Sequence, residues 1–381
     1  MKILLIGGTG ILSTDIVNEC LKRDYEVFIF NRGHNNSEID KKVNIIIGNI
    51  RNRKDLDSKL SKYKFDVIID FLSYKEEELK QNLEFFNGKC KQYIFISSAT
   101  VYRKTKKGEK ITENTEVNND LWDYALDKIK CEKVLANNYQ TNKQDYTIIR
   151  PYVTYSKKRI PFAIIPGKQW TLANRILNGK PILLWDGGKA RCTLTQTKEF
   201  AIGIVGLFLN ERAYEEIFNI TTNDSLTWKD ALEDIANALG KEVIIANVPS
   251  SFIIKELKEY KGVLLGDKGL DREFDNAKIR KYVLEFNPKI KFEEGIKETI
   301  DYYESNPKEQ KIDYIWDGKI DRTIEKYYKK MKVKYDKNKL TVKGYSHKLE
   351  TKDRIYYYIG RKKILYILYK VIRKVLNRWL R

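Results

Sequence analysis

The sequence predicts an α/β protein with a doubly wound parallel sheet, a smaller C-terminal lobe and a basic helical tail. Two observations predict the sheet: short apolar runs alternate with amphipathic stretches over the first 150 residues, and a glycine-rich turn follows the first run. Beyond that point, prolines and glycines interrupt the pattern, which indicates a separate lobe. A chain of 381 residues with 42% hydrophobic content can bury a sizeable core, which argues against a disordered or fibrous protein.

The expected elements follow the apolar runs in order. Buried strands are expected at 2–6, 26–31, 43–48, 67–70, 93–97 and 147–150, and helices at 11–22, 76–86 and 121–137. A later strand at 216–222 is expected to return to the sheet, and a helix at 228–239 is expected to end at Gly240. Parallel strands joined by right-handed crossovers place ligands at the carboxyl ends of the strands. This rule locates the site before any motif is considered.

The glycine turn has the form of a nucleotide-binding site. Strand 2–6 is followed by Gly7-Gly8-Thr9-Gly10-Ile11-Leu12-Ser13. Glycine permits a sharp turn and a close approach to a pyrophosphate, which the N–H groups and positive end of the helix stabilise. The context predicts a Rossmann-type domain in which Gly7, Gly10, Ile11 and Leu12 bind the cofactor, the alternative being an ordinary strand-to-helix turn. We assign residues 1–165 to this domain, 166–305 to a substrate-binding lobe and 306–381 to a basic C-terminal extension.

The end of the second strand favours NADP over NAD. NAD-binding folds usually offer a carboxylate to the ribose there, whereas this sequence has Asn31 and Arg32. The guanidinium of Arg32 matches a 2′-phosphate with two hydrogen bonds. A solvated surface arginine is the alternative, and NAD stays a second choice. Asn49, after the third strand, is a candidate partner for the adenine edge.

Tyr124 and Lys128 form the predicted catalytic pair. Four residues apart on a helix, they share one face, where an ammonium group stabilises phenolate and shifts the tyrosine toward a useful pKa. Tyr124 can then exchange a proton with a substrate hydroxyl while hydride passes to or from a nicotinamide, and Lys128 can also hold the ribose. Ser98 ends the strand at 93–97 and can stabilise charge on the reacting oxygen. Its alternative role is a turn cap.

These motifs, taken together, resemble the extended short-chain dehydrogenase/reductases of the NAD-dependent epimerase/dehydratase family. The resemblance covers roughly residues 1–300 and is carried by Gly7–Gly10, Ile96–Tyr102, Tyr124-x-x-x-Lys128 with Glu132, and Ile149-Arg150-Pro151. It implies Ser98, Tyr124 and Lys128 as the catalytic residues, a nucleotide-sugar substrate and a homodimer. The segments 31–33, 66–73 and 218–220 look like an atypical branch of this family.

Two departures from the family pattern refine the expectation. Ser13 stands where the third glycine of the turn usually lies, and it is small enough to permit close packing. Ala99-Thr100 replaces the Asp-Glu pair of sugar 4,6-dehydratases, so dehydration is disfavoured. The resemblance therefore implies a 4-epimerase or a 4-ketoreductase in surface polysaccharide or glycoconjugate biosynthesis. The candidates for substrate contacts are Thr100, Arg150, Arg175 and Arg191, with solvated surface charges as the alternative for the arginines.

The net charge and the cysteine content limit which other functions and which cellular compartment the sequence allows. The net charge of +20 favours a polyanionic partner, although a Lys-rich genome bias explains it equally well. A non-catalytic member of the fold that senses redox state or binds RNA is therefore the alternative function, and retention of the three catalytic residues argues against it. A reductase of a small non-sugar carbonyl is a third possibility. Four scattered cysteines and two distant histidines predict a reduced, cytoplasmic protein without a metal site.

The tail, residues 352–381, combines many basic residues with the single acid Asp353. The basic residues include Arg354, Arg361, Lys362, Lys363, Lys370, Arg373, Lys374, Arg378 and Arg381, and the apolar ones Ile364, Leu365, Ile367, Leu368, Val371, Ile372, Val375, Leu376, Trp379 and Leu380. Their spacing predicts an amphipathic cationic helix. Its apolar side can lie on the inner face of an anionic membrane, or dock on the protein's own core or a partner subunit. No apolar run approaches the roughly 20 residues that span a bilayer.

Overall fold

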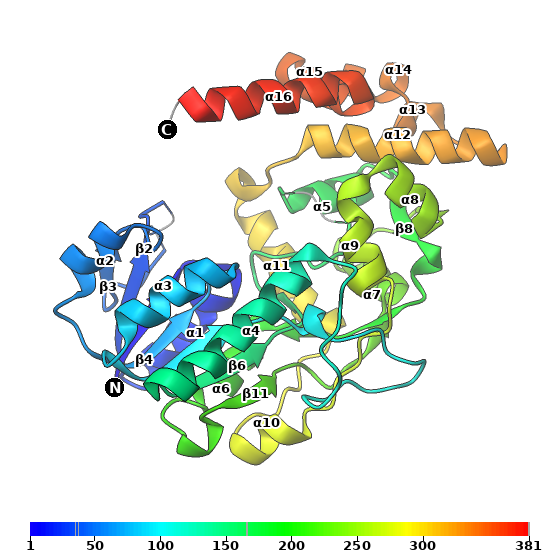
Figure 1. The fold of residues 1–381 in the computed structure, drawn as a ribbon. Helices are drawn as coiled ribbons and strands as arrows, with labels where there is room; N and C mark the ends of the chain where they lie inside the picture. The colour runs from blue at the N-terminus through cyan, green and yellow to red at the C-terminus, as the bar shows by residue number, and fades with distance from the viewer. Residues whose placement is uncertain (35, 37, 165–166, 380–381) are drawn as a thin grey trace. The chain divides into compact units, whose positions relative to one another are not determined.

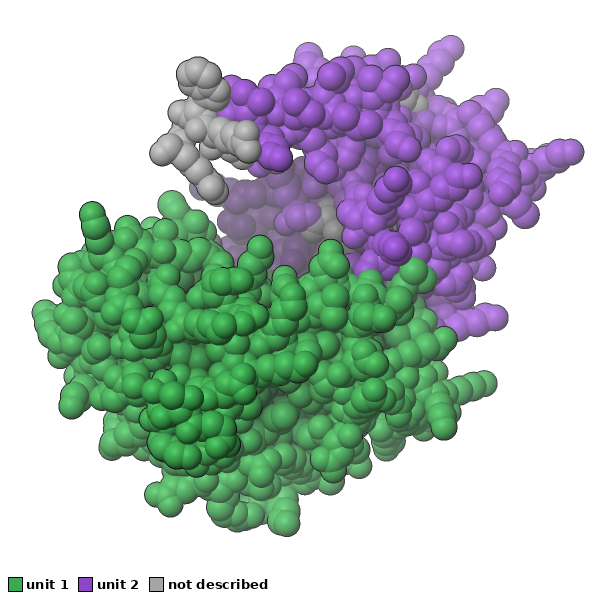
Figure 2. All heavy atoms as spheres, viewed as in Figure 1, with its two compact units in different colours: residues 1–156, 191–226, 265–295 green, residues 157–190, 227–264, 296–381 purple. Residues whose placement is uncertain are grey.

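The computed structural model describes residues 1–381 apart from residues 35, 37, 165, 166, 380 and 381. The chain divides into two compact units, which are coloured separately in Figure 2. Unit 1 contains residues 1–156, 191–226 and 265–295, and unit 2 contains residues 157–190, 227–264 and 296–381. The chain thus passes between the units repeatedly. The boundaries expected at 165 and 305, with a strand near 216–222 returning to the first domain, stay a prediction.

Unit 1 is built on a seven-stranded parallel sheet in the order β11-β6-β5-β4-β1-β2-β3 (Figure 1). The strands are β1 (Lys2–Ile6), β2 (Glu26–Asn31), β3 (Asn44–Ile47), β4 (Phe65–Asp70), β5 (Cys90–Ile96), β6 (Tyr146–Arg150) and β11 (Glu216–Asn219). The strand order changes direction between β1 and β4, which is where doubly wound sheets bind their ligands. The predicted fold class is confirmed.

Helices cover both faces of this sheet because its strands are buried on both sides. α1 (Ile11–Lys22) and α6 (Thr197–Val205) pack on one face, and α2 (Arg53–Leu60), α3 (Glu76–Phe86) and α4 (Asp123–Asn142) pack on the other. Within β1, Ile3 and Leu5 join the first core cluster and Leu4 and Ile6 the second, as the alternation of side chains along a strand requires. Unit 1 also contains β7 (Val153–Tyr155), β9 (Arg191–Cys192), β10 (Leu194–Gln196) and α10 (Ala277–Tyr282).

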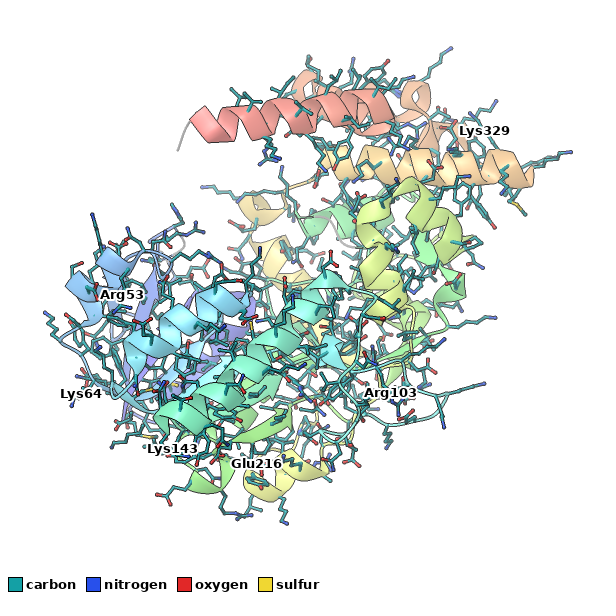
Figure 3. The ribbon with its side chains drawn as sticks, in the orientation of Figure 1. Arg53, Lys64, Arg103, Lys143, Glu216 and Lys329 are labelled. Carbon is teal, nitrogen blue, oxygen red and sulfur yellow. The ribbon has the colours of Figure 1, made fainter. Side chains whose placement is uncertain are left out.

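Strand β11 is the later strand that was expected to return to the sheet. It pairs with β6 in parallel, from Glu216 opposite Thr147 to Asn219 opposite Arg150. Glu216, labelled in Figure 3, also forms an ion pair with Lys278 at 2.5 Å. A segment far along the chain therefore completes the first sheet, so no single cut separates the two units.

Unit 2 is mainly helical around a short parallel pair of strands, β8 with β13. Its elements are α5 (Trp170–Leu177), β8 (Ile182–Trp185), α7 (Trp228–Ala238), β13 (Ile245–Val248), α8 (Ser250–Glu256), α9 (Lys261–Val263), α12 (Tyr314–Met331), α13 (Lys337–Leu340), α14 (Val342–Tyr345), α15 (Thr351–Arg361) and α16 (Lys363–Trp379). β12 (Leu226–Thr227) and α11 (Phe292–Ser305) span the boundaries between the units. In the part of the chain that the structure describes, no helix has both the length and the apolar character that crossing a bilayer demands.

The tail forms two helices where the sequence predicted one. α15 ends at Arg361 and α16 begins at Lys363. α15 packs against α12 at two glycines: a side-chain carbon at Gly318 would overlap the carbonyl oxygen of Tyr357, and one at Gly360 would overlap that of Ile315. Leu380 and Arg381, which the sequence assigns to the tail helix, lie outside the described residues.

Candidate active site

The glycine turn after β1 has the backbone geometry that a dinucleotide phosphate requires. Gly7 has a φ of +93°, in the left-handed region that side chains rarely adopt. A side-chain carbon at Gly8 would lie 2.6 Å from Cγ1 of Ile29, so this position also needs glycine. The chain can therefore reverse sharply at the end of β1 with its backbone open to a ligand.

Helix α1 starts directly after this turn. Gly10 is its N-cap, and the first-turn N–H groups of Ile11 and Leu12 have no acceptor within the helix. The buried Ser13 accepts a hydrogen bond from the N–H of Gly10 at 2.7 Å and donates one to the carbonyl oxygen of Gly7 at 3.1 Å. Ser13 thus closes the turn from inside, which explains how the turn dispenses with its third glycine. These residues fit the pyrophosphate of a nicotinamide dinucleotide.

Asn31 and Arg32 have different positions at the end of β2. Oδ1 of Asn31 accepts the N–H of Gly33 at 2.7 Å, and its Nδ2 donates to Oδ1 of Asn36 at 2.8 Å. Arg32 is exposed, and within the described residues no carboxylate forms an ion pair with it. Asn31 therefore shapes the turn, and the cation of Arg32 has no competing ion-pair partner among the residues that the structure describes.

Asn49 lies beside a small pocket of unit 1 that the sequence did not reveal. Its backbone N–H donates to Oδ2 of Asp55 at 2.7 Å, and its Oδ1 accepts the N–H of Arg51 at 3.1 Å. The pocket has a volume of about 170 Å³ and is lined by Ile50, Arg51, Leu72, Ser73, Glu77, Glu78, Gln81 and Asn82. Because this lining comes from three separate segments, no local motif announces it.

Ser98 lies just beyond the carboxyl end of β5. It is nearly buried, and its Oγ accepts hydrogen bonds from the N–H and the hydroxyl of Thr100, at 3.3 and 3.0 Å. Ser98 caps the short helical turn Ala99–Val101, so its alternative role as a turn cap is present. Since both bonds use its lone pairs, its own hydrogen is left to donate.

Tyr124 lies in the first turn of α4 and is half-buried among aromatic rings. Its ring centroid is 5.2 Å from that of Trp122 and 6.4 Å from that of Tyr74. Nζ of Lys128 in turn lies 4.8 Å from the centroid of Tyr74. Tyr74 therefore contacts both members of the predicted catalytic pair, and sequence reasoning did not assign it a role.

Lys128 places its ammonium group at the ends of two adjacent strands. Nζ donates to the carbonyl oxygen of Ser73 at 2.9 Å, after β4, and to that of Ile96 at 2.8 Å, at the end of β5. Burial lowers the pKa of Lys128 from 10.5 to about 8, and the charge of Asp70 acts in the opposite sense. The lysine is thus a partly desolvated cation at the carboxyl edge of the sheet.

Asp70 organises the loop that holds Lys128, and sequence reasoning missed it. Its buried carboxylate accepts the N–H groups of Leu72 and Ser73 at 2.8 and 3.0 Å and the hydroxyl of Tyr93 at 2.6 Å. Burial raises the pKa of Tyr93 well above its ordinary value, so the phenol stays a donor. These bonds fix the Ser73 carbonyl that accepts from Lys128. The sequence does show Asp70 as an acid at the end of an apolar run, but its partner Tyr93 comes from another strand, so the local pattern could not reveal the hydrogen bond between them.

Arg150, a predicted substrate contact, is buried in an ion pair, and substrate contact by it stays a prediction. Its buried guanidinium binds both carboxylate oxygens of Glu132, at 2.9 and 2.5 Å, and Glu132 also accepts the hydroxyl of Ser97 at 2.5 Å. This pair joins β6 to α4. The guanidinium also lies 4.8 Å from the ring centroid of Tyr102, so its charge is neutralised inside unit 1.

Arg175, also a predicted substrate contact that stays a prediction, lies in a buried ion-pair cluster. It is completely buried in unit 2, where its guanidinium pairs with Asp317 and with Asp321 at 2.7 Å. Lys180 is bound to the same two carboxylates at 2.6 and 2.7 Å, so the four groups neutralise one another.

Arg191 lies in unit 1 and is partly exposed. It pairs with Glu273 at 3.0 Å and donates to the carbonyl oxygen of Ser225 at 2.8 Å. A substrate contact by Arg191 or Thr100 stays a prediction.

Comparisons with known proteins agree with this architecture. The family model described as "NAD dependent epimerase/dehydratase family" matches residues 3–221. Chloroplast stem-loop binding protein of 41 kDa b from Arabidopsis thaliana is 27% identical over 317 residues, 78% of this chain and 78% of that protein. The bifunctional UDP-glucose 4-epimerase and UDP-xylose 4-epimerase 1 of Pisum sativum is 28% identical over 136 residues, 28% of this chain and 39% of that protein.

Solved structures share the fold at lower identity. UDP-glucose 4-epimerase of Thermus thermophilus, in complex with NAD, superposes with a TM-score of 0.65 at 20% identity over 80% of this chain and 100% of that chain. Epimerase Mth375 of Methanothermobacter thermautotrophicus gives a TM-score of 0.67 at 14% identity over 81% of this chain and 94% of that chain. Since the family match extends over more than half of the sequence, this chain belongs to the NAD-dependent epimerase/dehydratase family of short-chain dehydrogenase/reductases.

Proposed function

We propose that this chain is an NAD(P)-dependent enzyme that acts at C4 of a nucleotide-linked sugar, as an epimerase or a 4-ketoreductase. The observation that carries the proposal is the gathering of Ser98, Lys128 and the first turn of α4, which bears Tyr124, at the carboxyl ends of β4 and β5. The relatives named as UDP-sugar epimerases support a substrate of this class. A role in surface polysaccharide or glycoconjugate biosynthesis is part of the same proposal.

Tyr124 is the proton-exchanging group in this mechanism. A phenol with an ordinary pKa near 10 is a weak base at neutral pH, and the neighbouring ammonium of Lys128 stabilises its anion. Tyr124 takes the proton of the C4 hydroxyl when that carbon is oxidised and returns one when it is reduced. Its half-buried position among Trp122 and Tyr74 limits the competition from water.

Ser98 orients the same substrate oxygen. Because its Oγ already accepts two hydrogen bonds from Thr100, its hydroxyl hydrogen is left to donate to a substrate oxygen. That donor stabilises negative charge as the C4 oxygen loses its proton. Thr100 is a positioning residue in this scheme, and its hydroxyl also contacts substrate.

The glycine turn, Asn49 and Lys128 hold the dinucleotide. When bound, a nicotinamide cofactor supplies the hydride exchange that C4 chemistry needs. NADP is the proposed form, since the exposed guanidinium of Arg32 has no internal ion pair among the described residues and suits a 2′-phosphate. The pocket beside Asn49, lined in part by Ile50 and Leu72, takes the adenine.

Mass spectrometry of the purified protein mixed with a panel of nucleotide-sugars, with and without NADPH, tests the proposal. An epimerase converts a sugar without net use of cofactor, whereas a ketoreductase oxidises NADPH in proportion to product. If no member of the panel turns over in either condition, the catalytic proposal fails.

Stem-loop binding is a second candidate function, favoured by one specific observation. The relative that shares 27% identity over 78% of this chain is named as a stem-loop binding protein, and the net charge of +20 suits a nucleic acid partner. Ser98, Tyr124 and Lys128 would then have no catalytic role. Gel-shift titration with a labelled RNA hairpin, at rising salt and against an unstructured RNA of equal length, tests this candidate. A hairpin preference without sugar turnover would favour it over the enzyme.

We also propose a homodimer that works in the cytoplasm. All four cysteines are free, which agrees with a reducing compartment. Light scattering of the purified protein tests the oligomeric state, and fractionation of cells tests the location.

A further inference from the structure

Helix α16 presents a row of large apolar side chains to solvent. We name this row the apolar stripe: Ile364, Ile367, Leu368, Val371, Ile372, Val375 and Leu376. Their exposed fractions lie between 49% and 75%. The spacing of three and four residues puts them on one side of the helix. A continuous exposed stripe of this kind marks an interaction surface, unlike apolar residues scattered singly.

The opposite side of α16 is cationic. Lys370, Arg373 and Lys374 lie there, and none of them has an ion-pair partner among the described residues. The helix from Lys363 to Trp379 contains no acidic residue. Its unneutralised charge therefore favours an anionic partner.

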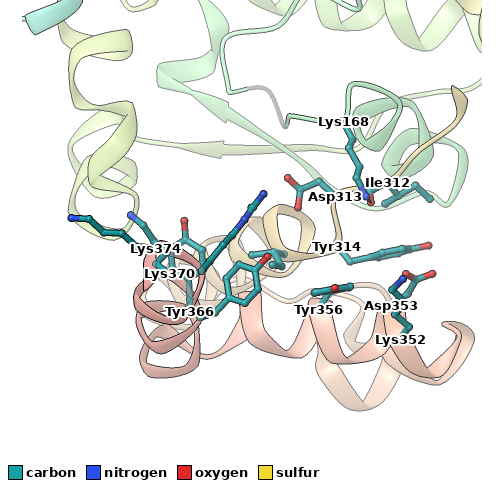
Figure 4. Close-up of a pocket in the computed structure, with 13 residues that line it drawn as sticks. Lys168, Ile312, Asp313, Tyr314, Lys352, Asp353, Tyr356, Tyr366, Lys370 and Lys374 are labelled. Carbon is teal, nitrogen blue, oxygen red and sulfur yellow. Dashed lines mark hydrogen bonds between the residues drawn. The ribbon is translucent and has the colours of Figure 1, made fainter. Parts of the chain in front are cut away.

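A large hollow separates this cationic side from the rest of unit 2. Its volume is about 1010 Å³, and Figure 4 shows Tyr366, Lys370 and Lys374 facing it from α16. Tyr314 and Tyr356 face it from α12 and α15. Lys370, Arg373 and Lys374 line this hollow, so they can extend along their flexible stems without breaking any ion pair among the described residues.

α16 is nevertheless attached to a fixed support. Arg361, at the end of α15, pairs with Glu325 of α12, and Nζ of Lys319 lies 4.5 Å from the ring centroid of Tyr366. The close packing of α12 and α15 at Gly318 fixes the start of the helix. The apolar stripe is therefore presented by a folded unit.

The structure argues against two other occupants of the apolar stripe. The protein's own core does not cover it, since all seven side chains are about half exposed or more. A second copy of the chain would bring together two α16 helices that contain no acid, so no ion pair between the two helices would add to the apolar contact.

We propose that α16 binds the surface of an anionic phospholipid membrane, with the apolar stripe among the upper acyl chains and its lysines and arginines among the lipid phosphates. Interfacial helices combine such an apolar side with Lys-rich and Arg-rich flanks, and lie in the plane of the bilayer. Each basic residue near an anionic surface adds about 1 kcal/mol of attraction. The binding is independent of the proposed enzymatic function, because it uses no residue of the active site.

Flotation of the full chain with vesicles tests the proposal. Vesicles of phosphatidylglycerol and phosphatidylcholine in equal parts should carry the protein upward, and vesicles of phosphatidylcholine alone should not. The variant Ile367→Glu/Val371→Glu should lose flotation, whereas Leu284→Glu, at a 91% exposed leucine of unit 1, should keep it. Inorganic phosphate added at high concentration should not release the protein, which separates a membrane surface from a free phosphate ligand.

A charge-matched pair of triple variants provides the second arm. Lys370→Glu/Arg373→Glu/Lys374→Glu should lower the vesicle-bound to free ratio by more than about tenfold. Lys104→Glu/Lys107→Glu/Lys110→Glu makes the same change of net charge on an exposed loop of unit 1 and should bind as the original chain does. Circular dichroism and NADPH binding report whether each variant is folded.

The outcomes separate the alternatives. Absence of flotation, or flotation that survives Ile367→Glu/Val371→Glu, overturns the proposal. If that variant instead turns a dimer into a monomer in light scattering, the stripe is an interface between copies, and the membrane proposal is overturned. Turnover of nucleotide-sugars should be unchanged in every folded variant, so failure of this proposal leaves the proposed function untouched.

Discussion

Lys128, on α4, is tied to Ile96, the last residue of β5, by a hydrogen bond of 2.8 Å between Nζ and the carbonyl oxygen. The bond crosses from helix to sheet two residues before Ser98. It therefore holds the helix that carries Tyr124 against the strand end that carries Ser98. Asp70 completes the arrangement by fixing the second carbonyl that accepts from Lys128, that of Ser73.

Removal of the Tyr124 hydroxyl should abolish turnover without loss of the cofactor. We expect Tyr124→Phe to lower kcat by about 100-fold or more, since a positioned proton-exchanging group contributes at least this factor. Tyr139→Phe, near the far end of the same helix, is the matched control and should retain full turnover. Quenching of intrinsic fluorescence by NADPH measures cofactor binding. Equal losses in both variants would refute the assigned role.

Lys128 should make the stability of the protein rise with pH. Its pKa is lowered from 10.5 to about 8 in the folded chain, so the unfolded chain binds more protons between these values. The free energy of unfolding should therefore gain about 2 kcal/mol from this group between about pH 7.5 and about pH 9.5. Urea unfolding of the original chain and Lys128→Met at both pH values measures this gain as the difference between the two chains. Identical pH slopes would contradict the prediction.

Ser13 should stabilise the glycine turn through its hydroxyl. Ser13→Ala leaves the N–H of Gly10 without its acceptor, and we expect a loss of about 1–2 kcal/mol of unfolding free energy together with weaker NADPH binding. Thr14→Ala, which removes an exposed hydroxyl bonded to Gly10, is the matched control and should cost much less. Thermal unfolding and fluorescence titration provide the two readouts. A larger loss of unfolding free energy in the control than in Ser13→Ala would show that the Ser13 hydroxyl is not what stabilises the turn.

Arg32 should select the phosphorylated cofactor. We expect Arg32→Gln to weaken the binding of NADPH about tenfold, which corresponds to the loss of one charge-assisted hydrogen bond. The affinity for NADH should stay within about twofold of its original value. Arg53→Gln, on the exposed side of α2 (Figure 3), should change neither affinity. Parallel titrations with the two cofactors decide the matter, and equal weakening of both would assign Arg32 a general role in the turn.

Arg150 and Glu132 should behave as one buried unit. Arg150→Met leaves a buried carboxylate uncompensated, and we expect a loss of about 3–5 kcal/mol of unfolding free energy. The double variant Arg150→Met/Glu132→Leu removes both charges and should recover most of this loss. Urea unfolding of the two variants and the original chain measures the coupling. Additive losses would show that the charges act separately.

Local patterns predicted unit 1 well where a strand is buried on both faces or a helix buries one face against the sheet. The bounds expected for strands 2–6 and 26–31 and for helices 11–22 and 76–86 agree with β1, β2, α1 and α3. Helix α4 starts two residues later than expected and extends to Asn142, because Lys143 in the left-handed conformation ends it there rather than any proline or glycine. Helix α2 was missed because its eight residues bury only Leu56 and Leu60.

The arginines show where sequence reasoning fails. Arg150 and Arg175 were expected to contact substrate or to be solvated surface charges, and both are buried, Arg150 with Glu132 of the preceding helix and Arg175 with two carboxylates of α12. Burial of a charge depends on its partner, and the partner of Arg175 lies more than 140 residues away. Likewise, Asp70 and Tyr74 gain their roles only when β4, β5 and α4 are assembled.

The phenol of Tyr357 donates to Oδ2 of Asp321 at 2.7 Å, inside the cluster that contains Arg175 and Lys180. A truncated chain that ends before Tyr357 would thus expose this buried charge cluster to water. Asp321 would also lose the hydrogen bond that the Tyr357 hydroxyl donates. The first half of the tail therefore covers the buried charge cluster of unit 2, and only the part from Lys363 onward can be deleted without exposing that cluster. Shortened versions of this protein should be cut there if their behaviour is to report on the tail alone.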